Sequence, residues 1–181
     1  MQSSLFNQKA RVMQQKLKVG GIFRFQHIRD GKVIDEWQEK NIVPDEGLAY
    51  ILGTSLDGAT TPVEAGWFVG LFSGNYTPLN TDTAANISAN SSETTTAYSE
   101  ANRVDWVQAG VTANLIGNSA SVAVFTFVDP STNVYGGFLV SSNVKGGTAG
   151  VLAAASRFDT LRVMLANDKL NVTYEITAAS S

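Results

Sequence analysis

The chain of 181 residues contains no cysteine and only one histidine. Without cysteine it can form no disulfide and no thiolate metal site, so its stability has to come from packing or from assembly with partners. No run approaches the roughly 18 apolar residues of a membrane span, and no apolar segment follows the basic start as in a secretory signal. We therefore expect a protein made in the cytoplasm, with neither a membrane segment nor a bound metal.

Charge is scarce and unevenly distributed, since charged residues make up 16% of the chain against a usual quarter. Residues 1–19 carry four basic and no acidic side chains, which gives a net charge of +4. Residues 20–181 carry nine basic and sixteen acidic side chains, which gives −7. Such an asymmetry is typical of a segment that docks elsewhere. The sequence predicts a basic N-terminal arm over 1–19 and one folded domain over 20–181.

Apolar side chains of the arm recur near helical spacing, and Gln and Lys fill the other side. Gly20-Gly21 ends this pattern and is a candidate hinge. The arm could be a helix that folds back on its own domain, or it could reach a neighbouring subunit, which we favour. Four basic charges without interleaved aromatics are a weak signal for membrane or nucleic acid, and we expect neither as a partner. The predicted interface residues of the arm are Leu5, Phe6, Lys9, Arg11, Met13, Lys16, Leu17 and Lys18.

The next segment predicts a hairpin followed by a helix. Residues 22–28 alternate in polarity, Asp30-Gly31 provides a two-residue turn, and residues 32–41 form the returning strand. Pro44 then precedes residues 45–56, whose apolar side chains have helical spacing.

A buried strand and a long polar connection come next. Residues 67–72 are apolar throughout, as in a strand that is buried on both faces. Residues 73–101 are rich in Asn, Thr, Ser and Ala, and a connection of this length is typical of a functional or mobile loop. One helical turn is expected within it, over 82–89.

The C-terminal half contains short strand candidates that are separated by turn residues, a pattern typical of an antiparallel sandwich or barrel. The segment Ser121–Val128 has no polar face, so we expect it to be a central strand. We predict a mainly β fold, an antiparallel β-sandwich that is jelly-roll-like, with one short helix and the N-terminal arm. The expected strands are 103–109, 111–116, 121–128, 134–142, 150–158, 161–166 and 170–178.

Residues that could support catalysis are few. His27 has no recognised nucleophile or carboxylate partner nearby in sequence, so we interpret it as structural. Paired carboxylates can cleave a glycosidic bond, but the sequence cannot place any two at the required separation. We expect no enzymatic activity, no catalytic residue and no cofactor.

Four aromatic residues could form a platform on which a sugar ring stacks, namely Trp37, Tyr50, Trp67 and Trp106. The apolar neighbours of Trp67 favour a place in the core. Trp37 and Trp106 lie among charged neighbours, and we predict that both are protein-interface residues.

Several stretches together resemble small virion structural proteins of tailed bacteriophages, most of all capsid cement or decoration proteins. The similarity covers roughly residues 22 to 180 and is carried by His27–Leu52, Trp67–Ile87, Ala97–Ala109, Val134–Ser142 and Ala154–Phe158. These segments contain no active-site signature, so no catalytic residue follows from the resemblance.

This resemblance implies a protein on the exterior of a phage head that bridges subunits of the major capsid protein. It also implies a homo-oligomer, either a dimer or a trimer. A tail or fibre-associated protein is the first alternative, and a glycan-binding β-sandwich module is the second.

Overall fold

The computed structural model describes residues 17–57 and 61–180, so the predicted arm residues Leu5, Phe6, Lys9, Arg11, Met13 and Lys16 lie outside the described residues. One sheet contains β1 (Leu17–Arg29), β2 (Lys32–Lys40), β5 (Leu115–Gly117), β6 (Ala123–Thr126) and β9 (Lys169–Ser180). The other contains β3 (Phe68–Phe72), β4 (Val104–Asp105), β7 (Thr132–Val140) and β8 (Leu152–Met164). The helices are α1 (Asp45–Leu56) and α2 (Ile87–Ser91).

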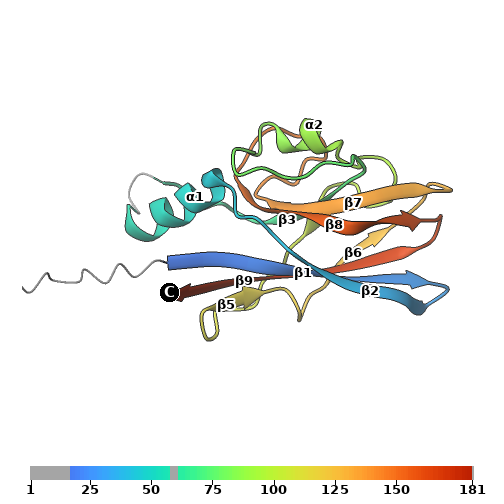
Figure 1. Ribbon diagram of the computed structural model, residues 1–181, viewed down its shortest axis with the longest axis horizontal. Coiled ribbons are helices and arrows are strands. Elements are labelled where there is room, and N and C mark those ends of the chain that lie inside the picture. The colour runs from blue at the N-terminus through green and yellow to red at the C-terminus, as the bar shows by residue number, and fades with distance from the viewer. Residues whose placement is uncertain (1–16, 58–60, 181) are drawn as a thin grey trace, which may run out of the picture.

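The two sheets form the layers of a sandwich, with α2 outside the second sheet and α1 at one end (Figure 1). Strand order is β2-β1-β9-β5 in the first sheet, where β6 also pairs with β9, and β4-β3-β7-β8 in the second. The pairings between the named strands are antiparallel. The predicted mainly β fold with two antiparallel sheets is confirmed.

The predicted hairpin is formed by β1 and β2. Asp30 and Gly31 both have left-handed φ values, 50° and 73°, as a two-residue type I′ turn requires. The expected alternation also holds, because Phe23, Phe25 and His27 point into the sandwich and are buried. The polar residues between them face solvent, so this sheet buries one face only.

Helix α1 begins at Asp45, directly after Pro44, as the sequence predicts. Its Gly47 lies against the backbone of β8, where a Cβ atom would come within 2.8 Å of the Leu152 carbonyl oxygen. The Glu46 carboxylate accepts hydrogen bonds from the amides of Leu152 (2.7 Å) and Ala84 (2.8 Å). These contacts fix the start of the helix to the second sheet.

Around β3 the second sheet is buried on both faces, which explains the unbroken apolar run of this strand. Its inner face joins the main core, where Val69 and Leu71 pack with aromatic side chains of the first sheet. Its outer face carries a separate cluster that includes Phe72 and Phe138, and Ile87 of α2 covers it. The long polar connection is therefore a lid over the sheet.

The C-terminal half differs from the prediction in several strands. The segments 150–158 and 161–166 form one continuous strand, β8, and a bulge in its pairing with β7 absorbs the irregularity. The strands predicted over 103–109 and 111–116 are much shorter in the structure, where they correspond to β4 and β5. A second helix, α2, overlaps the single turn expected at 82–89.

The strand β6 is not central as expected, because β9 is its one partner among the named strands. Its residues lack a polar face because the strand is covered although it lies at the end of the sheet. Phe125 lies in the core, and Tyr98 and Ser99 of the long connection cover the edge of the strand that does not pair with β9.

The predicted hinge at Gly20-Gly21 is wrong, since both residues lie inside β1 and pair with Thr177 and Ile176 of β9. Leu17 and Lys18 also belong to this strand, so the predicted boundary at 19/20 falls within β1. Gly21 is required for packing: a Cβ atom there would overlap the Glu175 carbonyl oxygen and lie 2.7 Å from the Tyr174 hydroxyl.

The two glycines provide a matched test of this placement. Gly21→Ala should lower the free energy of unfolding by about 1–3 kcal/mol, because the methyl group has no space beside Tyr174. Gly20→Ala should leave it unchanged or raise it by up to about 1 kcal/mol, because nothing lies within 4 Å of a Cβ atom there. Urea denaturation measures both, and equal effects of the two variants would contradict the strand assignment.

Candidate functional site

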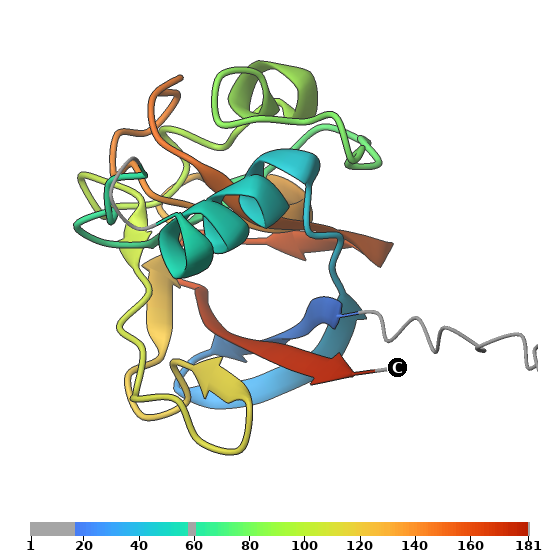
Figure 2. The same cartoon turned by 90° about the vertical axis from the view of Figure 1, so that its left-hand side faces the viewer.

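An apolar cleft opens at the end of the sandwich that carries α1. Its volume is about 190 Å³, and α1, the start of β1 and the end of β9 contribute to its walls. We call it the end cleft and define it by Val19, Tyr50, Ile51, Trp67, Tyr174 and Ile176. Figure 2 turns this end toward the viewer and shows α1 lying across the upper layer.

The walls of the end cleft are held by aromatic contacts. Tyr50 meets Trp67 edge to face with ring centroids 5.4 Å apart, and its hydroxyl accepts a hydrogen bond from the Glu64 amide (2.9 Å). Tyr174 stacks on Phe23 at 4.0 Å. Burial raises the pKa of the Tyr174 phenol, so this hydroxyl stays neutral at physiological pH. The cleft can hold apolar groups and offers no charge in its floor.

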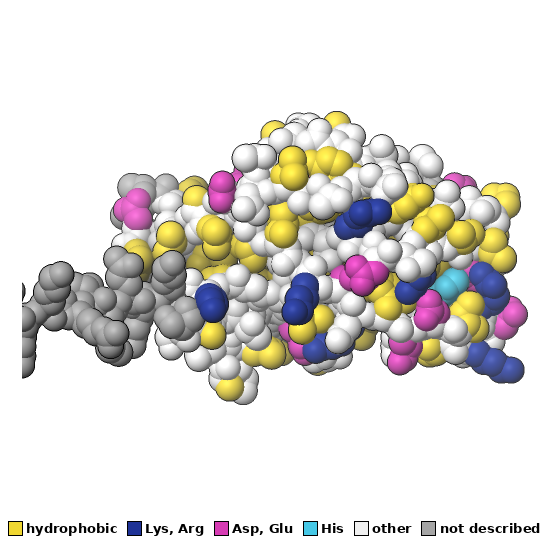
Figure 3. All heavy atoms as spheres, viewed as in Figure 1, with side chains coloured by type: hydrophobic (Ala, Val, Ile, Leu, Met, Phe, Trp, Pro, Cys, Tyr) yellow, Lys and Arg dark blue, Asp and Glu magenta, His cyan; other side chains and the backbone are white. Residues whose placement is uncertain are grey.

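Beside the end cleft, α1 exposes the side chains of Leu48, Leu52 and Leu56. They follow one another at a spacing of four, so they form a single stripe on the helix. Figure 3 shows hydrophobic side chains gathered where α1 lies above the start of β1. We call the end cleft together with this stripe the apolar end face. A contiguous apolar surface of this kind marks an interaction site more often than an isolated exposed leucine does.

The structure corrects the prediction for Trp106, which is only 4% exposed and belongs to the main core. Its indole nitrogen donates a hydrogen bond to the Tyr174 carbonyl oxygen (3.0 Å), which satisfies its one polar atom inside the domain. The neighbouring charged residues of the sequence misled the prediction, because alternate side chains of an extended segment point to opposite faces.

Trp37 is partly buried, and its ring is engaged within the domain. It stacks on Phe25 at 5.2 Å, meets Phe158 edge to face, and lies under the Arg162 guanidinium at 4.5 Å. With Trp106 in the core and Trp37 between its neighbours, the four aromatics do not form a shared stacking platform. Tyr50, Trp67 and the buried Trp106 line the end cleft, and only Tyr50 and Trp67 among the four are in direct ring contact.

His27 belongs to a buried polar cluster that the sequence did not reveal. Asp168 accepts hydrogen bonds from the Arg29 guanidinium at 2.7 and 2.8 Å, lies 2.7 Å from the His27 ring, and accepts the Leu165 amide at 2.8 Å. The Arg29 guanidinium holds the pKa of Asp168 well below its usual range, with further lowering by the Leu165 amide and His27. This cluster ties β1 to the turn before β9 and presents no nucleophile beside the imidazole.

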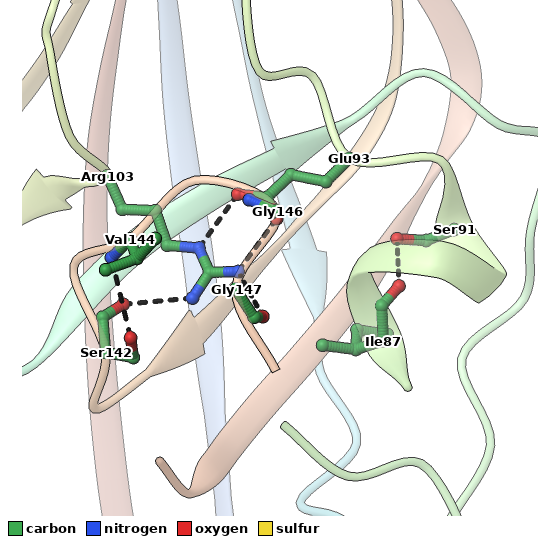
Figure 4. Close-up of polar contacts among 8 residues, drawn as sticks. All are labelled: Ile87, Ser91, Glu93, Arg103, Ser142, Val144, Gly146 and Gly147. Atoms are coloured by element: carbon green, nitrogen blue, oxygen red, sulfur yellow. Dashed lines mark hydrogen bonds and ion pairs between the residues drawn. The ribbon is translucent and has the colours of Figure 1, made fainter. Parts of the chain in front are cut away.

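Glu93 lies inside the segment that was expected to be a loop, and it forms an ion pair with Arg103 that is buried on both sides (Figure 4). The Arg103 guanidinium donates two hydrogen bonds of 2.8 Å to the Glu93 carboxylate and others to the carbonyl oxygens of Ser142 and Gly147. Glu93 also accepts the Gly146 amide (2.9 Å). Both side chains are essentially inaccessible, so this network fastens the long connection to the β7–β8 loop.

The outer face of the first sheet bears a polar hollow of about 460 Å³, lined in part by Arg24, Gln26, Glu36 and Asn171. These side chains pair with one another or with a neighbour: Arg24 with Glu175, Gln26 with Glu36, and Asn171 with Gln26. These four side chains are thus already engaged, whereas the apolar end face has exposed surface to bury.

Within residues 17–57 and 61–180, no cluster of three or more His, Cys, Asp or Glu side chains could hold a metal ion. No helix in that part of the chain is both long and apolar enough to cross a membrane. A scan against protein-family models and a search of curated proteins found no match to the chain.

Asp168 should make stability depend on acidity. Its carboxylate has a lowered pKa in the folded state, so its contribution is present above the unfolded value of about 3.9 and is lost as pH falls below it. Asp168→Asn should lower stability at neutral pH by about 1.5–3 kcal/mol and reduce the further loss between pH 5 and pH 3. Urea titrations at several pH values measure this, with the exposed Asp105→Asn as control. An unchanged acid dependence in Asp168→Asn would contradict the assignment.

The Glu93–Arg103 pair should show strong coupling in a double-mutant cycle. Glu93→Gln or Arg103→Met alone should destabilise the protein by about 3–5 kcal/mol, because each leaves a buried charge without its partner. The double variant should lose less than the sum of the two single variants, since no unpaired charge remains. Additive losses in thermal or urea unfolding would contradict this role.

Proposed function

We propose that the protein is a non-enzymatic structural protein of a tailed-phage virion, a cement or decoration protein that binds across boundaries between major capsid protein subunits on the outside of the head. The observation that carries the proposal is the apolar end face, in which an exposed leucine stripe of α1 lies beside an apolar cleft. The resemblance of residues 22 to 180 to such virion proteins supports the choice of a phage capsid as the place where this surface acts.

The physics of a capsid suits a small domain of this design. A shell repeats the same subunit boundary many times, and a protein that binds only the assembled boundary stabilises the shell by mass action. Each contact then needs only a limited apolar area around a few anchoring side chains. The apolar end face supplies such side chains in Leu52, Ile51 and Trp67.

A role as a rigid attachment domain also fits the ion pairs of the buried carboxylates Asp168 and Glu93. Asp168 and Arg29 hold the turn before β9, while Glu93 and Arg103 hold the long connection. Each pair is used to fix backbone segments, and these groups are arranged for shape rather than for chemistry on a substrate. The net charge of −3 would also limit adhesion between particles that display many copies.

Location within purified particles tests the proposal. Heads and tails separated from one preparation should differ, with the protein retained on heads in a fixed ratio to the major capsid protein, as measured by quantitative mass spectrometry. Its recovery with head-free tails would instead support a tail or fibre-associated protein, the alternative within the same class.

The cement role adds a second requirement. Heads stripped of the protein should release DNA at a lower temperature than intact heads, and adding the purified protein back should restore the original value. Readdition of Leu52→Glu should restore it less than readdition of Leu79→Glu, because the two leucines are similarly exposed but only Leu52 belongs to the apolar end face. Equal restoration by both variants would argue against a role of this surface in attachment, whether it contacts the capsid protein or joins neighbouring copies.

A further inference from the structure

The apolar end face has the shape and chemistry to receive a short segment of polypeptide. Leu52 is 51% exposed and Leu56 is 82% exposed, while Ile51 and Trp67 line the adjacent end cleft. A stripe at helical spacing beside an apolar cleft is the arrangement by which proteins bind amphipathic segments. The question is which segment covers it.

Residues 1–16 of the chain are suited to this surface in composition. They contain the apolar side chains of Leu5, Phe6, Val12 and Met13, three basic residues and no acidic one. They join the domain at Leu17, two residues before Val19, which lines the end cleft. Sixteen extended residues reach roughly 50 Å, so the segment is long enough to contact a neighbouring molecule.

Charge also favours this pairing. From Asn41 to Asn102 the chain has seven acidic residues and no Lys, Arg or His. Of the seven, the exposed Asp45 begins α1 and Glu64 lies in the segment that follows the helix. Opposite charges on the two partners speed their encounter and set their orientation, while the apolar contacts provide most of the affinity.

The strand pairing of β1 decides between the same chain and a second copy. A segment that returned to its own end face would have to reverse direction just before Leu17. Gly20 and Gly21 cannot serve as the hinge, because both are paired inside β1. Residues 1–16 contain neither glycine nor proline, the residues most suited to a tight reversal. A neighbouring molecule can be reached without any reversal.

We infer that residues 1–16 of one copy dock on the apolar end face of a second copy. If two molecules exchange their segments reciprocally, the contact closes a dimer, and if each donates to the next around a ring, it closes a trimer. This inference rests on the proposed function only for its setting, where copies lie side by side on a shell and the apolar end face contributes to attachment by joining those copies. The contact itself is a property of the purified protein.

The mass of the purified full-length protein in solution tests the inference. Light scattering coupled to size exclusion, from about 1 μM to about 1 mM, should show concentration-dependent association of the full chain. A chain that begins at Leu17 should stay monomeric with an unchanged melting temperature, because β1 is intact. A synthetic peptide of residues 1–16 should bind this shortened chain.

Point variants then assign the surface. Leu52→Glu should weaken self-association by about tenfold or more, since it places a charge in the apolar contact. Leu79→Glu, at a similarly exposed leucine (53%) outside the apolar end face, should not. Phe6→Ser with Met13→Ser should weaken association more than Lys9→Gln, Arg11→Gln and Lys16→Gln together, and the Gln variants should lose the dependence on salt.

Two results would overturn the inference. The first is a full-length protein that is monomeric over the whole range; if its melting temperature also falls on removal of residues 1–16, the segment docks on its own domain. The second is a shortened chain with the same mass behaviour as the full chain. Self-association without head binding would instead retain this inference and reject the cement role, so the two failures are distinguishable.

Discussion

The pairing of the first described strand with the last is the constraint on which the rest of the structure depends. Twelve residue pairs join β1 to β9, from Leu17 opposite Ser180 to Ile28 opposite Lys169. One end of this ladder brings Arg29 and His27 to Asp168, and the other brings Val19 and Ile176 to the end cleft. Both the buried ionic cluster and the proposed docking surface therefore exist only once strands about 150 residues apart have paired.

Two buried carboxylates extend this order to the loops. Asp168 fixes the turn that leads into β9, and Glu93 fixes the long connection against the β7–β8 loop. A connection of this length usually carries high conformational freedom. Here Arg103 and the apolar cluster under α2 hold the connection against the second sheet as a covering layer. The connection is therefore not the candidate site, which lies instead at the end of the sandwich.

Much of the fold could be predicted from local patterns, because these patterns carry their own physical cause. Asp30-Gly31 specifies its turn by left-handed φ values, and Pro44 with the leucines after it specifies α1. The errors came from long-range contacts. In the sequence Gly21 resembles a hinge, but in the structure Tyr174 and Glu175 pack against it. Trp106 was predicted to be exposed because of its charged neighbours, but its indole N–H donates a hydrogen bond to the Tyr174 carbonyl oxygen inside the domain. The ionic partners Glu93 and Arg103 carry no local signal, and the end cleft combines residues from distant parts of the chain.

The position of β9 makes the end cleft one of the last features of the molecule to be completed during synthesis. Because Tyr174 and Ile176 of this strand help to form the end cleft, a chain still on the ribosome that lacks β9 has no completed docking surface. Its N-terminal segment emerges first, yet neighbouring nascent chains offer it no finished acceptor. If residues 1–16 dock as proposed, an unfinished chain could donate its own segment but could not accept one.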